Sequence, residues 1–211
     1  MNKTNIFVLI VIAFSFGVGY YFYPQMPQSM ASHWGIGGRV NGYMPKFWGV
    51  FLLPIMTLAL WLLFLLIPKI DPLKSNITQF KKYFDRFVGL IVLFLFYIYL
   101  LTIAWNLGYR FEVSRFMVPA LAVLFYGAGS LIEHAKPNWF IGIRTPWTLS
   151  SAVVWEKTHR VGGQLFKAAG ILALGGLFFP ALTFYFVFFP VIAVAMFTLI
   201  YSWAIYQKEK K

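Results

Sequence analysis

The sequence contains no cysteine and little charge. None of its 211 residues is a cysteine, which excludes disulfide bonds. Charged residues make up 11% of the chain, whereas ordinary soluble domains carry about 25%. Hydrophobic residues reach 60%, and 21% of the chain is aromatic. This composition excludes an ordinary soluble domain and indicates a protein built for lipid.

Acidic residues and histidines are also scarce, with six Asp and Glu residues and three His. Ion-coupled carriers usually place ionisable groups inside their membrane spans, and the apolar runs of this chain offer hydroxyl groups instead. The sequence has no phosphate-binding glycine loop. Its basic residues are scattered, which argues against direct nucleic acid binding. A carrier for an uncharged substrate remains an alternative.

Long charge-free runs predict membrane-spanning helices. A helix needs about 20 apolar residues to cross the hydrocarbon core. Four runs approach that length: Ile6–Tyr23, Phe47–Ile67, Phe87–Trp105 and Phe116–Ile132. The first exceeds the apolar core of a usual signal peptide, so we expect a retained span. Another charge-free run separates Lys167 from Lys208, and its prolines predict two helices joined near Pro180–Thr183. The sequence therefore predicts an all-α, polytopic membrane protein with six transmembrane helices.

The distribution of basic residues predicts the orientation. With six spans, both termini lie on one side of the membrane. Only four of the 18 Lys and Arg residues fall on the other side: Arg39, Lys46, Arg110 and Arg115. The positive-inside rule then predicts an N-in, C-in protein of the cell membrane, in contact with the lipid bilayer.

The loops between the spans differ in composition. Proline and glycine crowd the outer loop Pro24–Lys46, which predicts a compact, irregular structure. Four of its residues are candidates for outer-face recognition: His33, Trp34, Gly35 and Gly38. The inner loop Pro68–Arg86 has apolar residues at helical spacing, which predicts an amphipathic helix in the inner headgroup layer.

The inner loop 136–163 contains the densest set of polar, turn-forming residues. Gly142 permits close backbone approach or an unusual backbone angle. Pro146 fixes a bend and biases Thr145 towards an extended conformation. Ser150 or Ser151 can cap a new helix.

The helix that follows is expected to be short and interfacial. Ser151, Trp155 and His159 fall four residues apart on one face. The pair Gly162-Gly163 is expected to loosen the helix before the fifth span begins. The Trp and Arg residues could be interfacial anchors, but their convergence favours a specific interaction surface. Its candidate binding or signalling residues are Arg144, Thr145, Pro146, Trp147, Thr148, Trp155, Lys157, His159 and Arg160.

Catalysis and metal binding are less well supported by the sequence. Glu156 and His159 share a helical face at a spacing found in metal-binding bundles, and only Glu133 and His134 are plausible further ligands. We expect no metal, no cofactor and no catalytic residue. A membrane-embedded enzyme using His159 and Glu156 is the least favoured alternative.

The inner loop resembles the signature of SdpI-type immunity proteins. The matching residues are Ile143-Arg-Thr-Pro-Trp-Thr-Leu-Ser-Ser151, Val154-Trp155 and Lys157-Thr-His-Arg160. Such proteins frequently have an acidic residue where this chain has Ala152. The run Tyr23-Pro…Pro27…His33-Trp-Gly35…Gly38 resembles a small membrane domain of unknown function that commonly precedes this signature. We therefore expect a two-span domain over 1–70 and a four-span SdpI-like domain over 71–211.

The resemblance implies a function other than catalysis. SdpI-type proteins protect a cell against a secreted peptide toxin. They can also act as its receptor and sequester a transcriptional repressor at the membrane. The implied partners are a peptide toxin on the outer face and a repressor on the cytoplasmic face. A general envelope-stress role is equally compatible, and a small-molecule transporter or exporter is the main alternative.

Overall fold

The computed structural model describes residues 3–35 and 38–210 and divides the chain into two compact units. Gly37, one of the turn-forming glycines of the outer loop, lies outside the described residues. The first unit, called the hairpin unit below, comprises Met1–Phe64 and Val88–Met117. The second, called the signature unit, comprises Leu65–Phe87 and Val118–Lys211. A domain boundary at residue 70 stays a prediction.

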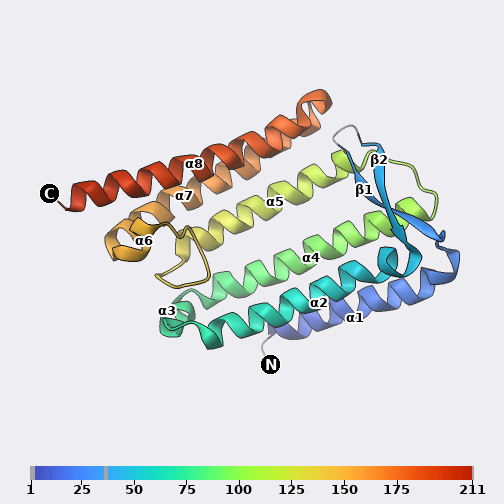
Figure 1. Cartoon of the computed structure of the whole chain (residues 1–211), viewed down its shortest axis with the longest axis horizontal. Coiled ribbons are helices and arrows are strands. Elements are labelled where there is room, and N and C mark those ends of the chain that lie inside the picture. The colour runs from blue at the N-terminus through green and yellow to red at the C-terminus, as the bar shows by residue number, and fades with distance from the viewer. Residues whose placement is uncertain (1–2, 36–37, 211) are drawn as a thin grey trace. The chain divides into compact units, whose positions relative to one another are not determined.

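Long helices and one β-hairpin form the hairpin unit. Its elements are α1 (Lys3–Phe22), the 3₁₀ turn η1 (Tyr23–Gln25), β1 (Ser29–Trp34), β2 (Val40–Pro45), most of α2 (Lys46–Ile70) and most of α4 (Lys81–Asn106). The chain passes from α1 through the hairpin into α2 (Figure 1). The apolar runs predicted as the first three spans lie within these three helices, except that Tyr23, at the end of the first run, belongs to η1.

The outer loop contains a β-hairpin, so the expected irregular structure of this loop is wrong, within a chain that is otherwise mostly helical as predicted. Strands β1 and β2 pair antiparallel, with Met30 opposite Met44. The hairpin is attached to the end of α4 by one side chain. Asn106 accepts a hydrogen bond from the Ala31 N–H (2.8 Å) and donates one to the Ala31 carbonyl (3.0 Å). This pairing satisfies both backbone groups of Ala31.

The core of the hairpin unit lies beneath the hairpin. Met30 is fully buried and packs with Met26, Val50, Tyr99 and Ile103. Met30 comes from β1, Met26 directly follows η1, and the other three come from α2 and α4. The apolar face of the hairpin is therefore buried against these helices.

The signature unit is built from the remaining helices. They are α3 (Lys74–Gln79), most of α5 (Val113–His134), α6 (Pro146–Ser150), α7 (Ala152–Ala173), the 3₁₀ turns η2 (Leu174–Leu177) and η3 (Pro180–Leu182), and α8 (Thr183–Glu209). Helices α7 and α8 run side by side (Figure 1). The predicted turn near Pro180–Thr183 is confirmed.

The inner loop Pro68–Arg86 is not one amphipathic helix. Helix α2 continues to Ile70, α3 is a separate short helix, and α4 begins at Lys81. Ile77, Phe80 and Phe84 are buried as a helical apolar face predicts, but Ile70 and Leu73 are exposed. The break arises where Asp71 caps the Leu73 N–H with its carboxylate (2.7 Å).

Helix α7 continues without interruption through Gly162-Gly163, so the expected loosening at this pair is wrong. The two glycines allow close packing instead. A Cβ on Gly162 would collide with the side chain of Ile143 and press on Thr198 of α8. A Cβ on Gly163 would collide with the backbone carbonyl of Gly129 on α5. The expected short interfacial helix is therefore the first half of a longer packed helix.

Among the described residues, five helices are long and apolar enough to cross a membrane. They are Lys3–Gln25, Lys46–Ile70, Lys81–Asn106, Val113–His134 and Pro180–Glu209. Helix α7 is not among them because its first half contains several charged residues. The protein is a multi-pass protein of the cell membrane, and a sixth span stays a prediction.

Candidate functional site

The signature loop, residues 135–151, joins α5 to α7 and is folded around Asn138. This side chain is 1% exposed. Its Oδ1 accepts hydrogen bonds from the N–H groups of Phe140 (2.9 Å) and Ile141 (2.6 Å). Its Nδ2 donates to the carbonyls of Lys136 and Ile141, both at 2.8 Å. The side-chain amide of Asn138 thus satisfies backbone groups of this turn that have no partner in regular secondary structure.

Two residues of the α2–α3 region attach to the same loop. Asp71, 2% exposed, accepts a hydrogen bond from the Trp139 N–H at 2.9 Å. Asn76 donates to the Pro137 carbonyl at 2.8 Å. Sequence reasoning missed both residues. The available signal was an acidic residue placed directly after a long apolar run, where a buried or capping role is common.

His159 and Trp155 hold the next part of the loop from α7. The two rings stack with centroids 3.9 Å apart, and both side chains are 1% exposed. Trp155 Nε1 donates to the Ala135 carbonyl (2.8 Å), and His159 Nε2 accepts from the Ile143 N–H (2.9 Å). Gly142 lies against the imidazole with φ +114°, and a Cβ there would collide with Nε2. The predicted close approach and unusual backbone angle of Gly142 are confirmed.

The second ring nitrogen of His159 establishes its charge state. Nδ1 lies 2.8 Å from the Trp155 carbonyl, an acceptor, so Nδ1 carries the proton and Nε2 does not. The imidazole is therefore neutral. Burial lowers the pKa of His159 from 6.5 to about 4, although the hydrogen bond to the Trp155 carbonyl opposes this shift.

A network of hydroxyl groups connects the signature loop to α8. Thr145, extended as predicted, caps α6 by accepting from the Thr148 N–H at 3.2 Å. The Thr148 hydroxyl accepts from the Thr145 N–H (2.9 Å) and donates to the Ile143 carbonyl (2.8 Å). The Thr145 hydroxyl donates to Ser202 on α8 at 3.0 Å. All three hydroxyl side chains are buried.

Ser151 makes a second connection to α8. Its hydroxyl caps α7 by accepting from the Val154 N–H (3.2 Å), which confirms the predicted capping role. It also donates to the Glu209 carboxylate at 2.6 Å. The signature loop thus bonds to two residues in the last turns of α8, Ser202 and Glu209.

The predicted site residues separate into a buried frame and an exposed surface. Thr145, Thr148, Trp155 and His159 are buried and bond to the loop backbone or to α8. The exposed members are Arg144, Pro146, Lys157 and Arg160, with Trp147 half-buried. Buried side chains cannot touch a partner directly, so only the second group can form a contact surface.

Two arginines of this surface have internal partners as well. Arg144 Nη1 donates to the Trp139 carbonyl at 2.7 Å. Arg160 pairs with Glu156 one turn earlier at 2.9 Å, with both side chains well exposed. An exposed pair of this kind contributes little to stability, so Arg160 remains available to a competing anion.

The residues weighed as metal ligands are not brought together. Glu133 pairs with Lys167, and His134 stacks on the ring of Tyr83. His159 uses both ring nitrogens, one with the Trp155 carbonyl and the other with the Ile143 N–H. Within residues 3–35 and 38–210, no group of three or more His, Asp or Glu side chains could hold a metal ion.

The outer-face candidates belong to the hairpin unit. His33 is exposed, and its Nδ1 lies 2.5 Å from Asn41 Oδ1 across the hairpin. Trp34 is half-buried and packs edge-to-face on Trp105 of α4, with centroids 5.9 Å apart. Gly35 and Gly38 close the end of the hairpin through a hydrogen bond from the Gly38 N–H to the Gly35 carbonyl (2.9 Å). Of the four, His33 is the side chain best placed for a partner.

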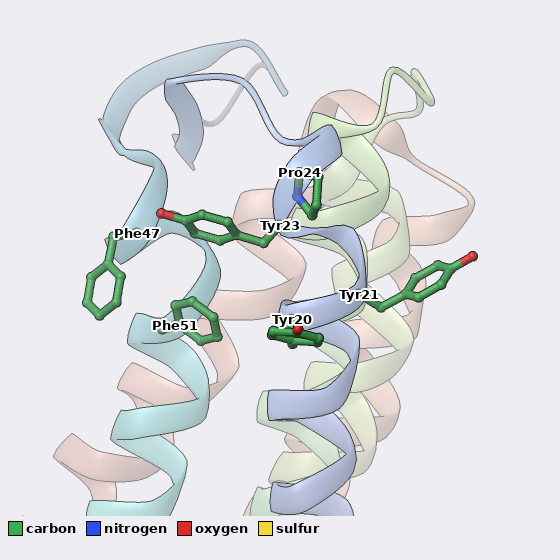
Figure 2. A pocket seen from close by; sticks show the side chains of 6 residues that line it. All are labelled: Tyr20, Tyr21, Tyr23, Pro24, Phe47 and Phe51. Carbon is green, nitrogen blue, oxygen red and sulfur yellow. The ribbon is translucent and has the colours of Figure 1, made fainter.

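An aromatic groove opens below the hairpin, between the end of α1 and the start of α2. The cavity measures about 530 Å³ and is lined by Tyr20, Tyr21, Tyr23, Pro24, Phe47 and Phe51. Figure 2 shows the Tyr23 ring reaching from η1, directly after α1, towards Phe51 of α2, on which it stacks with centroids 5.7 Å apart. The Lys46 ammonium lies 4.7 Å from the centre of the Tyr23 ring.

Comparison with known proteins finds two families, one matching part of the signature unit and the other part of the hairpin unit. Residues 134–202 match the SdpI/YfhL protein family, and residues 10–58 match a domain of unknown function, DUF1648. Immunity protein SdpI of Bacillus subtilis (strain 168) is 26% identical over 209 residues, which covers 99% of this chain and 97% of that protein. No solved structure matches the chain. The resemblance predicted from the inner loop is confirmed.

Proposed function

We propose that this chain, a multi-pass membrane protein of the SdpI/YfhL family, protects the cell that makes it against a secreted peptide toxin. The observation that carries the proposal is its similarity to an immunity protein along nearly the whole length of both chains. The buried frame supports it, because the family segment 134–202 contains both the signature loop and its Ser202 partner on α8.

The proposed orientation places the signature loop in the cytoplasm. Both termini and the loop then share the side that holds most of the Lys and Arg residues. This orientation requires α7 from Gly162 onward, extended by η2 to Leu177, to cross the membrane as the remaining span, with Lys167 paired to Glu133 of α5. The hairpin faces the medium, where a secreted toxin arrives.

On the cytoplasmic side, the exposed residues of the signature loop and of the start of α7 capture a transcriptional repressor. Arg144, Lys157 and Arg160 are basic and exposed, and Pro146 and Trp147 lie beside Arg144 in the sequence. Arginine and tryptophan dominate the binding energy of many interfaces. The buried frame holds the backbone of this surface in one conformation, which lowers the entropy cost of binding.

On the outer side, the hairpin meets the toxin. His33 is exposed on the hairpin, and the two hydrogen bonds between the Asn106 side chain and the Ala31 backbone attach the strands to α4. The aromatic groove beside Lys46 lies within the same unit. An apolar peptide segment would find stacking partners there.

Survival and operon induction, assayed separately, test both halves of the proposal. In toxin-exposed cells, His33→Ala should reduce survival. Lys157→Ala combined with Arg160→Ala should chiefly impair induction, because a cytoplasmic partner reaches only that side. Truncation of an interface anchor often costs about 2 kcal/mol or more, which corresponds to a roughly 30-fold loss of affinity. Lys208→Ala, an exposed basic residue of α8, is the matched control and should leave both outputs unchanged.

Membrane levels of every variant must be measured alongside. Equal loss of both outputs in the two variants at normal levels would contradict the division of labour. Normal survival of cells without the gene would contradict the immunity function itself.

A further inference from the structure

Trp139 and Phe140 form an exposed pair in the turn that follows Asn138 in the signature loop, called the aromatic tip below. Trp139 is 54% exposed and Phe140 is 39% exposed. Neither residue belongs to the family motif recognised in the sequence, and the proposed function uses neither. Two neighbouring aromatic rings held outward on an ordered turn imply a partner.

The aromatic tip is held by side-chain hydrogen bonds on each side of it. Asp71 accepts from the Trp139 N–H, and Arg144 donates to the Trp139 carbonyl (2.7 Å). Asn138 accepts from the Phe140 N–H. These backbone groups need no water, so the tip can enter a less polar medium without leaving them unpaired.

The aromatic tip lies at the level where two candidate spans end. Asp71, which bonds to Trp139, directly follows Ile70, the last residue of α2. Helix α5 ends at His134, five residues before Trp139 in the sequence. Tryptophan is enriched at this boundary between hydrocarbon and water.

Exposed basic residues lie on both segments that form the base of the aromatic tip. Lys136 and Arg144 flank the tip in the sequence, and Lys69 and Lys74 flank Asp71, which bonds to Trp139. The stretches 69–76 and 134–144 contain a single acidic residue, Asp71, which is 2% exposed and engaged with two N–H groups. A set of exposed cations beside buried acid favours an anionic ligand.

We propose that the aromatic tip and its four basic neighbours form a binding site for anionic phospholipid headgroups. Trp139 and Phe140 insert at the boundary between the headgroups and the acyl chains, while the ammonium and guanidinium groups contact the phosphates. The site fixes the depth of the signature loop at the membrane surface. It does not depend on the proposed immunity function.

Spin labelling can test this site because the chain contains no cysteine. A nitroxide is attached to Phe140→Cys, and to Lys210→Cys as a control at the end of α8. The purified protein is placed in vesicles of phosphatidylcholine alone or in equal parts phosphatidylcholine and phosphatidylglycerol. Collision rates with oxygen and with a water-soluble nickel complex report the depth of the label. The label at 140 should favour oxygen and the label at 210 the nickel complex.

The anionic preference has its own readout. Phosphatidylglycerol should move the label at 140 deeper, and Lys74→Gln combined with Lys136→Gln should abolish that shift. Each basic residue near an anionic surface changes binding roughly fivefold. A label at 140 as accessible to nickel as the control would overturn the membrane site and favour a protein partner. A label that is deep in both lipids, with no shift, would overturn the anionic preference. Folding of each variant is checked by its thermal melting.

Discussion

His159 uses both ring nitrogens: Nδ1 donates to the Trp155 carbonyl of its own helix, and Nε2 accepts from the Ile143 N–H of the signature loop. A protonated imidazole has no acceptor nitrogen, so the bond from the Ile143 N–H exists only in the neutral form. The residue that sequence reasoning placed on an interaction surface instead acts inside the protein. Its effect on any partner would pass through the position of the loop backbone.

Acid should therefore destabilise the signature unit through His159. The folded-state pKa of about 4 lies below the unfolded value of 6.5, so the unfolded chain binds the proton first as the pH falls. Stability is unaffected above about pH 6.5 and decreases between that value and about pH 4, by at most about 3 kcal/mol. Thermal melting in nanodiscs at about pH 7.5 and about pH 5 measures the loss. His159→Gln, which cannot titrate, should melt with a smaller pH dependence; an equal dependence would assign the effect to other groups.

Gly142→Ala should be strongly destabilising for two separable reasons. Its φ of +114° strains any side chain, and its Cβ would also collide with His159. Gly108 is a matched control, because its φ is +104° and nothing lies within 4 Å of a Cβ there. We expect Gly108→Ala to cost about 1–3 kcal/mol and Gly142→Ala to cost clearly more. Equal melting temperatures of the two variants would show that His159 moves aside without cost.

At the scale of elements, the length of the apolar runs predicted most of the helices. It failed to predict structures that depend on a contact with a residue distant in the sequence. Four predicted spans lie within α1, α2, α4 and α5 because charge-free runs of that length have one stable arrangement in lipid. The hairpin was missed because its attachment comes from Asn106, 75 residues away from Ala31. The prediction that Gly162-Gly163 loosens the helix was wrong because the sequence around two glycines does not indicate which helices pack against them.

Close packing at Gly163 can be tested by adding one methyl group. A Cβ on Gly163 would collide with backbone atoms of Gly129 and Glu133, which cannot rotate away. Gly163→Ala should therefore push α7 from α5 and cost about 2 kcal/mol or more. Gly17→Ala in α1 is the control, since nothing lies within 4 Å of its Cβ. Melting temperatures of the two variants decide the point, and an unchanged value for Gly163→Ala would show that the helices separate easily.

At the scale of the whole molecule, the residue types of the site were predictable but their division of labour was not. The signature identified Arg144, Trp155 and His159 as one set, and the structure buries the last two while leaving the first exposed. Periodicity placed Trp155 and His159 on one helical face, but it cannot tell whether that face meets a partner or the protein itself. Asp71 was overlooked because its loop partner, Trp139, lies 68 residues away.

The predicted orientation follows from the charge distribution and can be tested in intact cells. Single cysteines replace exposed basic residues on each predicted side, at Arg39 and Arg110 outside and at Lys82 and Lys157 inside. A membrane-impermeant maleimide should label only the first two before the cells are opened, and all four afterwards. Labelling of Lys157→Cys in intact cells would reverse the proposed side of the signature loop.

The connections between the signature loop and α8 impose an order on biosynthesis. The loop is synthesised 57 and 58 residues before its partners Ser202 and Glu209, so Thr145 and Ser151 lack those partners until α8 is made. During that interval the Thr145 hydroxyl has no α8 group to bond. Thr145 and Ser151 therefore gain their bonds to Ser202 and Glu209 only after α8 has been made.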